Sequence, residues 1–306
     1  MGAVSEKIKI SVVLCTYNGE KYLSEQLDTL IRQTYSFYEL IICDDASTDS
    51  TLAIIREFEK KDTRIKVFQN SSNLGFNKNF ETAIKHSTGN WIAPADQDDI
   101  WEINKLEIMS GEILPDTTLV HCNSTKFYGT DSGNKIINPS YQKFSGSDAR
   151  KLFFYNTIEG HAMLIQRSVA EAAFPLPDDI YYDWWLGFHA ALKGTVVWNK
   201  NYLVNRRIHE QNASEKQMAT VRKNKKLLQQ ALFYTEHFTK AAIENSSVSS
   251  FGKVLLGKLQ LAINGIRKPL FFFMLRNRKL IYYYKPYKPL VGTVGRLKAI
   301  FRFLKS

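Results

Sequence analysis

The first hundred residues alternate between short apolar runs and segments with helical periodicity. Residues 9–18 (KISVVLCTYN) and 39–45 (ELIICDD) are apolar runs that end in polar residues, whereas residues 20–33 (EKYLSEQLDTLIRQ) repeat leucine and isoleucine at helical spacing. The cycle continues as helix, strand, helix and strand at residues 47–61, 64–70, 76–87 and 90–96. This alternation predicts a mostly parallel α/β sheet with right-handed crossovers and helices on both faces.

Polar residues gather where the predicted strands end. Ligands of such sheets bind beyond the carboxyl ends of the strands, and that edge here carries residues 16–18, 44–45, 73–78 and 96–99. Asn and Asp are common after strands because they form turns and cap helices, so each loop alone is weak evidence. Four polar loops at one rim indicate a ligand site. The sequence has neither GxGxxG after the first strand nor a P-loop motif, which excludes the usual dinucleotide and triphosphate fingerprints.

Three carboxylates fall within four positions at the end of the last of these strands. Asp96, Asp98 and Asp99 in NWIAPADQDDIW would repel one another if held close, unless a cation offsets their charge. Hard divalent cations prefer oxygen ligands and bridge phosphate oxygens. We therefore predict a metal site that neutralises the phosphates of a nucleotide. Asp99 has an alternative role, as the cap of a helix that begins at Ile100.

Four segments together carry a family resemblance. CTYNGEKYLSEQLDTLIRQTY, ELIICDDASTDST, NLGFNKNFETA and WIAPADQDDIWEINK resemble the successive motifs of the family 2 glycosyltransferases with a GT-A fold. DQDDIW resembles the bacterial rhamnosyltransferase-like branch. The likeness is strong over residues 8–110 and weaker over 110–212. It implies a nucleotide-diphosphate sugar donor, a divalent metal (Mn²⁺ or Mg²⁺) on the DxD-type motif, and inverting transfer to an acceptor hydroxyl.

The resemblance also assigns residues to the nucleotide and the metal. Asp96 and Asp98 form the DxD pair, of which Asp98 is the stronger candidate for metal contact. Glu20 would in any case be favoured by the helix dipole in the first turn of its helix. The family pattern implies that a pair of acids, Asp44 and Asp45, reaches the base and ribose. The full set of nucleotide-binding residues that it implies is Thr16, Tyr17, Glu20, Asp44, Asp45, Lys78 and Asp96.

Inverting transfer needs a base that removes the acceptor proton on the face opposite the leaving diphosphate. Asp183 in DDIYYDWWLGFHAALKG matches the family's acidic base motif, although Tyr182 replaces the usual Glu. Asp183 also opens a helical stretch, so it is a candidate N-cap as well.

A second segment resembles the end of the family pattern. NRRIHEQNAS is similar to its Arg-x-x-His-x-x-Asn segment, which implies Arg206 or Arg207 near the diphosphate and His209 as a third metal ligand. His161, between apolar neighbours in IEGHAMLI, is predicted to be a structural residue on a strand.

The end of the chain is strongly basic. Residues 251–306 contain 13 Lys and Arg and no Asp or Glu, whereas the first 250 residues hold 28 bases against 30 acids. Because these cations are interleaved with aromatic and aliphatic residues, we favour docking on an anionic membrane surface. Helices that pack on the main domain are the alternative, and nucleic-acid binding is disfavoured. No apolar run reaches the roughly 18 residues needed to span a bilayer.

These observations combine into one expectation. Residues 1–214 form a GT-A catalytic domain, with a nucleotide-binding half at about 8–110 and an acceptor-binding half at about 111–214. Residues 215–306 form a helical, basic, membrane-associating region, within which a polar link at 245–250 precedes the basic tail. The expected location is cytoplasmic, on the inner face of the membrane, since no secretory signal is recognised and the three cysteines are widely spaced.

The predicted function is inverting transfer of a sugar, with rhamnose favoured by resemblance alone, from a dTDP- or UDP-linked donor to a glycan or lipid-linked glycan. The alternatives are a catalytically inactive sugar-nucleotide-binding or scaffold protein, and a nucleotidyltransferase. The last would need a glycine-rich, basic first loop, which TYNGEKY is not.

Overall fold

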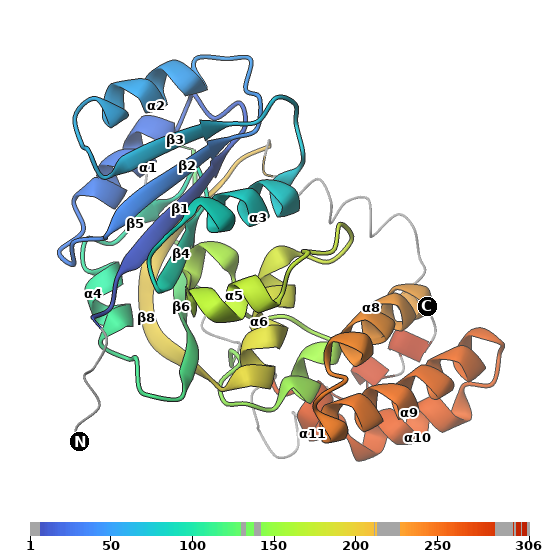
Figure 1. The fold of residues 1–306 in the computed structure, drawn as a ribbon. Helices are drawn as coiled ribbons and strands as arrows, with labels where there is room; N and C mark the ends of the chain where they lie inside the picture. Colours follow the sequence, from blue (N-terminus) through green and yellow to red (C-terminus); the bar gives the residue numbers. More distant parts are fainter. Residues whose placement is uncertain are drawn as a thin grey trace, which may run out of the picture. The chain divides into compact units, whose positions relative to one another are not determined.

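The computed structural model describes residues 7–129, 133–137, 142–210, 212, 227–284, 296, 298–300 and 302–304. Figure 1 shows its helices and strands. The chain divides into two compact units. Unit 1 comprises Met1–Ile137 and Ile158–Ile208, and unit 2 comprises Asn138–Thr157 and His209–Ser306. The expected boundary near residues 214 and 215 lies outside the described residues and stays a prediction.

The described strands of unit 1 form one eight-stranded sheet, in the order β3-β2-β1-β4-β7-β6-β8-β5. The first four run parallel to one another: β1 (Ile10–Thr16), β2 (Glu39–Asp44), β3 (Ile65–Gln69) and β4 (Trp91–Ala95). Strand β6 (Thr117–Tyr128) is parallel to β8 (Thr195–Ile208), while β7 (Met163–Gln166) is antiparallel to both β4 and β6. The sheet is therefore mostly parallel, as the sequence predicts.

Three helices connect the first four strands: α1 (Leu23–Ile31), α2 (Thr51–Glu59) and α3 (Phe76–His86). The chain moves outward from β1 to β3 and then returns to the other side of β1, so right-handed crossovers place α3 on the face opposite α1 and α2 (Figure 1). The leucines of α1 that show helical spacing, Leu23, Leu27 and Leu30, are fully buried against the sheet in the core of unit 1. The predicted elements of the first hundred residues are all present.

The segment after β4 differs from one expectation. Residues Ile100–Trp101 form the short strand β5, which pairs antiparallel with β8, and the next helix, α4, spans Lys105–Ser110. The proposed role of Asp99 as the cap of a helix beginning at Ile100 is therefore wrong. The edge of the sheet takes these two residues because β8 extends far enough to pair with them.

The second half of unit 1 adds the short helices η2 (Gly160–Ala162) and α5 (Arg167–Ala172) and the longer α6 (Tyr182–Lys193). Helix α6 begins at Tyr182 because Asn77 of α3 holds the preceding turn. The Asn77 Nδ2 donates to the carbonyl oxygen of Ile180 at 2.8 Å, and its Oδ1 accepts the Tyr182 N–H at 3.1 Å. This contact ties the start of α6 to α3, which packs on the first strands of the sheet.

The described part of unit 2 is helical. It contains η1 (Ala149–Phe153), α8 (Leu227–Ala241), α9 (Ser246–Ile263), α10 (Lys268–Arg276) and α11 (Arg278–Ile281). Its interior is aromatic, since the ring of Phe153 lies edge-on to Phe238 and Phe251 at centroid distances of 5.7 and 5.5 Å. Among the residues that the structure describes, no helix has the length and apolar character needed to cross a bilayer.

The prediction of a polar link at residues 245–250 is wrong. These residues are the N-cap and first turn of α9, where the side chain of Asn245 accepts the N–H of Val248. Serine-rich sequence and helix starts share their chemistry, because short polar side chains cap the first free N–H groups of a helix. The composition that predicts a linker is therefore equally typical of a helix N-terminus.

Candidate active site

The loops after β1 and β2 are joined by a buried aspartate. Asp44 is fully buried, and its Oδ1 accepts hydrogen bonds from the hydroxyls of Thr16 at 2.9 Å and Ser47 at 2.5 Å, while Oδ2 accepts the Ser47 N–H. A carboxylate that accepts several hydrogen bonds in the interior fixes the groups that donate them. Thr16 and Asp44 thus hold the rim of the sheet in shape, and their contact with a nucleotide stays a prediction.

The neighbouring Asp45 holds the loop that enters α3. It is 3% exposed, and it accepts the N–H groups of Leu74 and Gly75 at 2.9 and 3.0 Å and the side-chain amide of Asn70 at 2.8 Å. Lys78, one turn into α3, is exposed and lies 3.4 Å from a carboxylate oxygen of Asp178. Both predicted nucleotide residues are therefore placed at the carboxyl edge of the sheet.

The first loop presents an exposed aromatic ring at this edge. Tyr17 is 47% exposed, and its backbone is held by the side-chain amide of Gln97, which accepts the Tyr17 N–H at 2.9 Å and donates to the Tyr17 carbonyl at 3.1 Å. Glu20 accepts the N–H of Ser50 at 2.9 Å, so it links the first loop to the start of α2. The loop is thus ordered by contacts from the loop after β4 and from the N-cap of α2, while the Tyr17 ring remains available to a ligand.

Gly19 allows this arrangement because a side chain there would displace Gln97. A Cβ at Gly19 would lie 2.3 Å from Gln97 Oε1, so we expect Gly19→Ala to break both Gln97–Tyr17 hydrogen bonds and to destabilise unit 1 by about 1–3 kcal/mol. Tryptophan fluorescence during urea unfolding measures this, since all five tryptophans belong to unit 1.

The control for this test introduces Gly19→Ala a second time, into a protein that already carries Gln97→Ala. Gln97→Ala removes the same two hydrogen bonds without a clash, so Gly19→Ala should add little destabilisation once Gln97 is absent. Additive costs would show that the close approach of Gly19 and Gln97 is not the cause.

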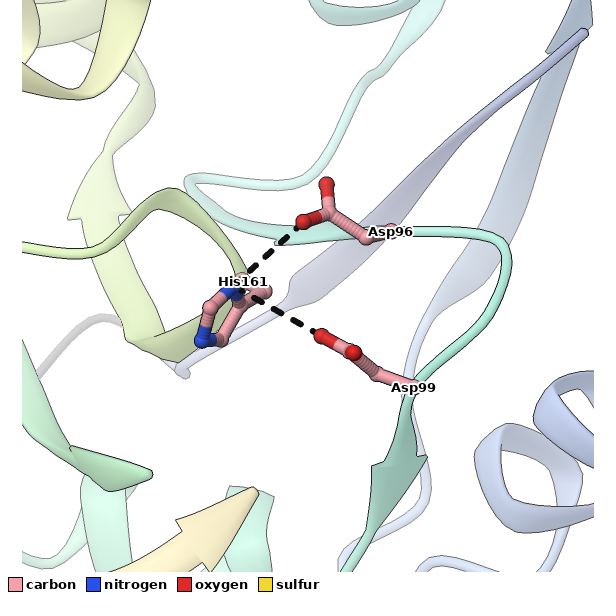
Figure 2. Close-up of side chains that lie close together, drawn as sticks. All are labelled: Asp96, Asp99 and His161. Carbon is pink, nitrogen blue, oxygen red and sulfur yellow. Dashed lines mark hydrogen bonds and ion pairs between the residues drawn. The ribbon is translucent and has the colours of Figure 1, made fainter. Parts of the chain in front are cut away.

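Two aspartates and a histidine from distant parts of the chain meet beside this loop (Figure 2). His161 in η2 places Nδ1 3.3 Å from an oxygen of Asp96 and 3.6 Å from an oxygen of Asp99. One donor atom from each of the three residues lies within 4.8 Å of the others. His161, predicted to be structural and on a strand, instead belongs to a short helix at the acidic cluster.

The charges of this cluster depend on one another. Burial raises the pKa of Asp99 to about 8, and the nearby Asp98 and Asp96 act in the same direction against His161. Burial alone would lower the pKa of His161, but the charges of Asp99 and Asp96 and the hydrogen bond to Asp96 outweigh it and raise that pKa. Burial alone would raise the pKa of Asp96, but the hydrogen bond and charge of His161, with the charges of Arg206 and Lys105, together outweigh it and lower that pKa. His161, Arg206 and Lys105 are therefore the groups of the protein that act against the accumulation of negative charge at this cluster.

The same cluster fits a divalent metal. Asp99 Oδ2 is buried and has no hydrogen-bond partner among the described residues, and oxygen and imidazole donors suit Mn²⁺ and Mg²⁺ to different degrees. The donors brought together are Asp96, Asp99 and His161 rather than the expected Asp96, Asp98 and His209. Metal contact by Asp98 stays a prediction. So does contact by His209, which belongs to unit 2 and has Nε2 3.3 Å from the side-chain amide of Asn212.

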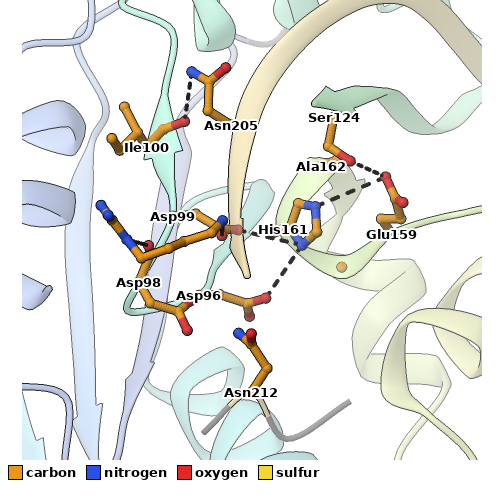
Figure 3. A network of polar contacts seen from close by, with 12 residues as sticks. Asp96, Asp98, Asp99, Ile100, Ser124, Glu159, His161, Ala162, Asn205 and Asn212 are labelled. Atoms are coloured by element: carbon orange, nitrogen blue, oxygen red, sulfur yellow. Dashed lines mark hydrogen bonds and ion pairs between the residues drawn. The ribbon is translucent and has the colours of Figure 1, made fainter. Parts of the chain in front are cut away.

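A second set of contacts fixes the position of His161 (Figure 3). On one side its Nε2 lies 3.9 Å from Glu159, whose carboxylate accepts the hydroxyl of Ser124 at 2.7 Å. On the other side its carbonyl accepts a 2.7 Å hydrogen bond from the ammonium of Lys105, which lies 3.0 Å from the centre of the Trp101 ring. Burial lowers the pKa of Lys105 to about 7. Lys105 thus holds the backbone of His161, while the carboxylates of Asp96, Asp99 and Glu159 surround its ring.

Asp183 lies next to this cluster through η2. It is the second residue of α6, after Tyr182, so it is not the N-cap, a position that Tyr181 occupies. Its Oδ2 accepts the N–H of Gly160, the residue before His161, at 3.2 Å. Asp183 is half-buried, and its desolvation by the surrounding protein raises its pKa to about 7, against hydrogen bonds from Trp184 and Gly160. This value suits a group that takes up a proton near neutral pH.

Tyr182 stands where the family pattern has a glutamate. Its side chain is buried and its ring stacks on Phe80 of α3 at a centroid distance of 4.2 Å. The ring packs against the core, so Asp183 is the acid that this segment offers at the rim.

The two adjacent arginines of β8 have different environments. Arg207 is fully buried, and its guanidinium donates to the carbonyl oxygens of Asp98 and Gly129 and to the carboxylate of Glu25. The side chain of Arg207 is enclosed and engaged by protein acceptors, which disfavours its predicted diphosphate contact; that contact stays a prediction. Arg206 is only half-buried, and its charge helps to lower the pKa of Asp96. Arg206 remains the candidate for the diphosphate.

Comparisons with known proteins agree with this geometry. The family model described as Glycosyl transferase family 2 matches residues 11–174, more than half of the chain. UDP-Glc:alpha-D-GlcNAc-diphosphoundecaprenol beta-1,3-glucosyltransferase WfgD from Escherichia coli is 38% identical over 105 residues, which cover 34% of this chain and 41% of that protein. The chain spans about half or less of the length of three of the curated relatives that it matches.

Solved structures share the fold. S. aureus TarS 1-349 in complex with UDP-GlcNAc superposes with a TM-score of 0.63 at 16% identity, over 97% of this chain and 82% of that one. The mannosyltransferase PcManGT from Pyrobaculum calidifontis, in complex with GDP-Man and Mn²⁺, gives 0.57 at 15% identity, over 97% and 87%. The predicted GT-A type α/β fold, a mostly parallel sheet flanked by helices, is confirmed.

Proposed function

The chain belongs to glycosyl transferase family 2, and from this premise we propose that it moves a sugar from a nucleoside-diphosphate donor to an acceptor hydroxyl with inversion at the anomeric carbon. One observation carries the proposal. Consecutive residues of η2 contact Asp183 and the Asp96/Asp99/His161 cluster, so a half-buried carboxylate with a pKa of about 7 lies beside a candidate metal site.

In this mechanism Asp183 is the general base. Its carboxylate accepts the proton of the acceptor hydroxyl as the hydroxyl oxygen attacks the anomeric carbon, and the bond to the nucleoside diphosphate breaks on the opposite face. The backbone N–H of Gly160 orients the carboxylate through its hydrogen bond. Arg206 is positioned to hold negative charge near Asp96. The exposed ring of Tyr17 offers a flat surface for the nucleotide base.

The proposed metal is Mn²⁺ or Mg²⁺. Asp96 and Asp98 of the DxD-type motif, with Asp99 and His161, would hold it, and when bound it offsets the charge of the donor diphosphate. His161 would hold the metal through a nitrogen of its neutral ring, because a metal ligand must have a free lone pair. His209 remains a proposed further ligand.

The proposed donor and acceptor rest on the likeness of this chain to members of the family. A dTDP- or UDP-linked sugar, with rhamnose favoured by DQDDIW alone, is the proposed donor, and the rhamnosyltransferase-like branch is proposed on the same motif. A lipid-linked glycan is the proposed acceptor, in line with the diphosphoundecaprenol substrate in the name of the Escherichia coli relative. The pathway proposed is synthesis of a cell-surface polysaccharide.

We also propose that the protein has two domains, with a boundary at residue 214, and that it acts in the cytoplasm at the inner face of the membrane. The basic helical region 215–306 would hold it there. Helices α9 and α10 support this, because they expose apolar side chains beside exposed cations such as Lys253 and Lys268. The exposed apolar residues are Val254 (50%), Leu261 (40%) and Ile263 (37%) of α9, Ile266 (54%) between the two helices, and Phe272 (63%) of α10.

Nucleotide and metal binding test the donor site directly. We expect UDP or dTDP with Mn²⁺ to raise the melting temperature of unit 1, measured by tryptophan fluorescence, because a ligand at about 100 times its Kd stabilises the native state by about 2.7 kcal/mol. GDP and CMP should have smaller effects, and EDTA should remove the shift. Asp98→Asn should lose it as well.

Asp179→Asn is the matched control, since it removes one exposed carboxylate outside the acidic cluster. An equal shift without metal, or one that Asp98→Asn retains, would contradict the role of Asp98. No shift with any nucleotide would favour the alternative of a scaffold protein that is inactive as an enzyme.

A further inference from the structure

Unit 2 contains a cavity that the transfer reaction does not use. Its volume is about 470 Å³, and all of its lining residues belong to unit 2. They come from four parts of the chain, namely the two residues after η1, the first residue of α8, the end of α11 with the residues after it, and the helical residues 298–300 and 302–304. Cavities of a few hundred cubic ångströms are typical of small-molecule sites.

The walls of this cavity are aromatic and fixed in position. The rings of Tyr155 and Tyr284 stack at a centroid distance of 4.0 Å, and Phe154 lies edge-on to Phe303 at 5.9 Å. The backbone of Tyr284 is held as well, since its carbonyl accepts the N–H of Gln142 at 3.0 Å. Stacked rings with an anchored backbone form an apolar surface that persists without a ligand.

The rim of the cavity is cationic. Lys298 and Arg302 line it, both are exposed, and they are four residues apart in helical segments, so their side chains project from the same face. Neither forms an ion pair with another described residue, and no acidic residue lines the cavity. Residues 251–306 contain no Asp or Glu at all. Two cations above an aromatic cavity match a ligand with a phosphate at one end and a hydrocarbon at the other.

We propose that this cavity binds one phosphorylated lipid, with its phosphate between Lys298 and Arg302 and the first part of its hydrocarbon chain between Tyr155, Tyr284 and Phe303. A phosphate recruits both cations, while the aromatic walls remove apolar chain from water. The ligand is either a bilayer phospholipid or the phosphorylated carrier of a lipid-linked glycan. This inference deepens, and rests on, the proposed association of unit 2 with an anionic lipid surface.

Titration calorimetry of the full chain with farnesyl phosphate tests the site. We expect binding that farnesol and inorganic phosphate each match only at concentrations at least about tenfold higher. The double variant Lys298→Gln/Arg302→Gln should weaken binding of farnesyl phosphate by at least about tenfold, because it removes both cations. Ala299→Trp should do the same with both cations in place, because Ala299 lines the cavity and a tryptophan would fill it.

Lys253→Gln/Lys268→Gln is the matched control, since it removes the same charge from exposed positions that do not line the cavity. It should retain the affinity of the native chain. An equal loss in this control, unchanged binding by Ala299→Trp, or farnesol binding as tightly as farnesyl phosphate would overturn the site. Native circular dichroism of each variant shows that unit 2 remains helical.

Vesicle sedimentation then distinguishes a bilayer phospholipid from a phosphorylated carrier as the ligand. It also distinguishes failure of the proposed membrane association from failure of the proposed site. Phosphatidylcholine vesicles are given the same surface charge with either phosphatidylglycerol or a polyprenyl phosphate, and the preferred one identifies the source. If the native chain binds neither, the membrane association and the site both fail. If all variants bind anionic vesicles alike and farnesyl phosphate is not bound, the site fails alone.

Discussion

Asp183→Asn is expected to lower kcat for sugar transfer by about 10²- to 10⁴-fold, the usual contribution of a general base. Asparagine keeps the shape of the side chain and can still accept the Gly160 N–H, but it cannot take the proton of the acceptor hydroxyl. The stabilisation of unit 1 by donor nucleotide and metal should stay unchanged, because Asp183 contacts neither in the proposed mechanism. Radiolabelled sugar transfer and thermal unfolding with nucleotide measure the two effects.

The control for this substitution is Asp179→Asn, four residues upstream and exposed. It should leave kcat within about twofold, because surface substitutions away from the site have little effect. Transfer at the native rate by Asp183→Asn would move the base to another residue. A native chain that binds nucleotide and transfers no sugar to any acceptor would favour the scaffold alternative.

The pH dependence of transfer follows from the same carboxylate. A base works only when ionised, so kcat/KM should fall as the pH is lowered through about 7, the value to which desolvation raises the pKa of Asp183. Stability has the opposite sign. The folded-state pKa lies above the ordinary value of 3.8, so this group favours folding below that value and loses the contribution as the pH rises to about 7. Asp183→Asn should therefore raise the melting temperature at pH 8.

Local patterns in the sequence account for the framework of this site. Each of the first four strands is a short apolar run between turn-forming residues, and each helix has its own periodic face, so neither requires knowledge of distant contacts. The rule that ligands bind at the carboxyl ends of parallel strands then places Asp44, Asp45 and Asp96 at one rim. The structure has all three there.

The remainder of the site depends on contacts between distant residues. His161 reaches Asp96 and Asp99 from a point more than sixty residues away, and nothing near it in the sequence except Glu159 distinguishes it from a buried structural histidine. The sequence also allows Asp99 to cap a helix, because the two residues after it are compatible with either a helix or a strand. Only the pairing of β5 with β8 decides that question.

The sequence also does not decide which of the adjacent residues Arg206 and Arg207 faces the interior. Successive side chains of a strand point to opposite faces, so one of the two arginines must face the interior when the other faces the rim. The order of apolar residues around them does not fix the register of β8. In the structure Arg207 is enclosed between Tyr22 and Phe127, with its guanidinium 4.4 and 4.5 Å from the two ring centres.

Arg207→Met is expected to destabilise unit 1 by on the order of 3 kcal/mol, because it leaves the carbonyls of Asp98 and Gly129 and the carboxylate of Glu25 without their donor. Methionine fills a similar volume, so the loss measures the polar contacts rather than a cavity. For a unit of this size the melting temperature should fall by about 6–12 °C, as followed by tryptophan fluorescence. Arg207→Lys should recover little, since an ammonium cannot reproduce the planar fork.

Arg206→Met is the paired control on the same strand. It should leave the melting temperature of unit 1 nearly unchanged and weaken its stabilisation by UDP or dTDP with Mn²⁺, because Arg206 is half-buried and lies near Asp96. The reverse result, with a stable Arg207→Met that loses nucleotide binding, would assign the diphosphate to Arg207 instead. The two neighbours thus separate a residue that shapes the acidic loop from one that meets its ligand, because the Arg207 guanidinium donates to the Asp98 carbonyl and the Arg207 N–H donates to the Asp99 carboxylate.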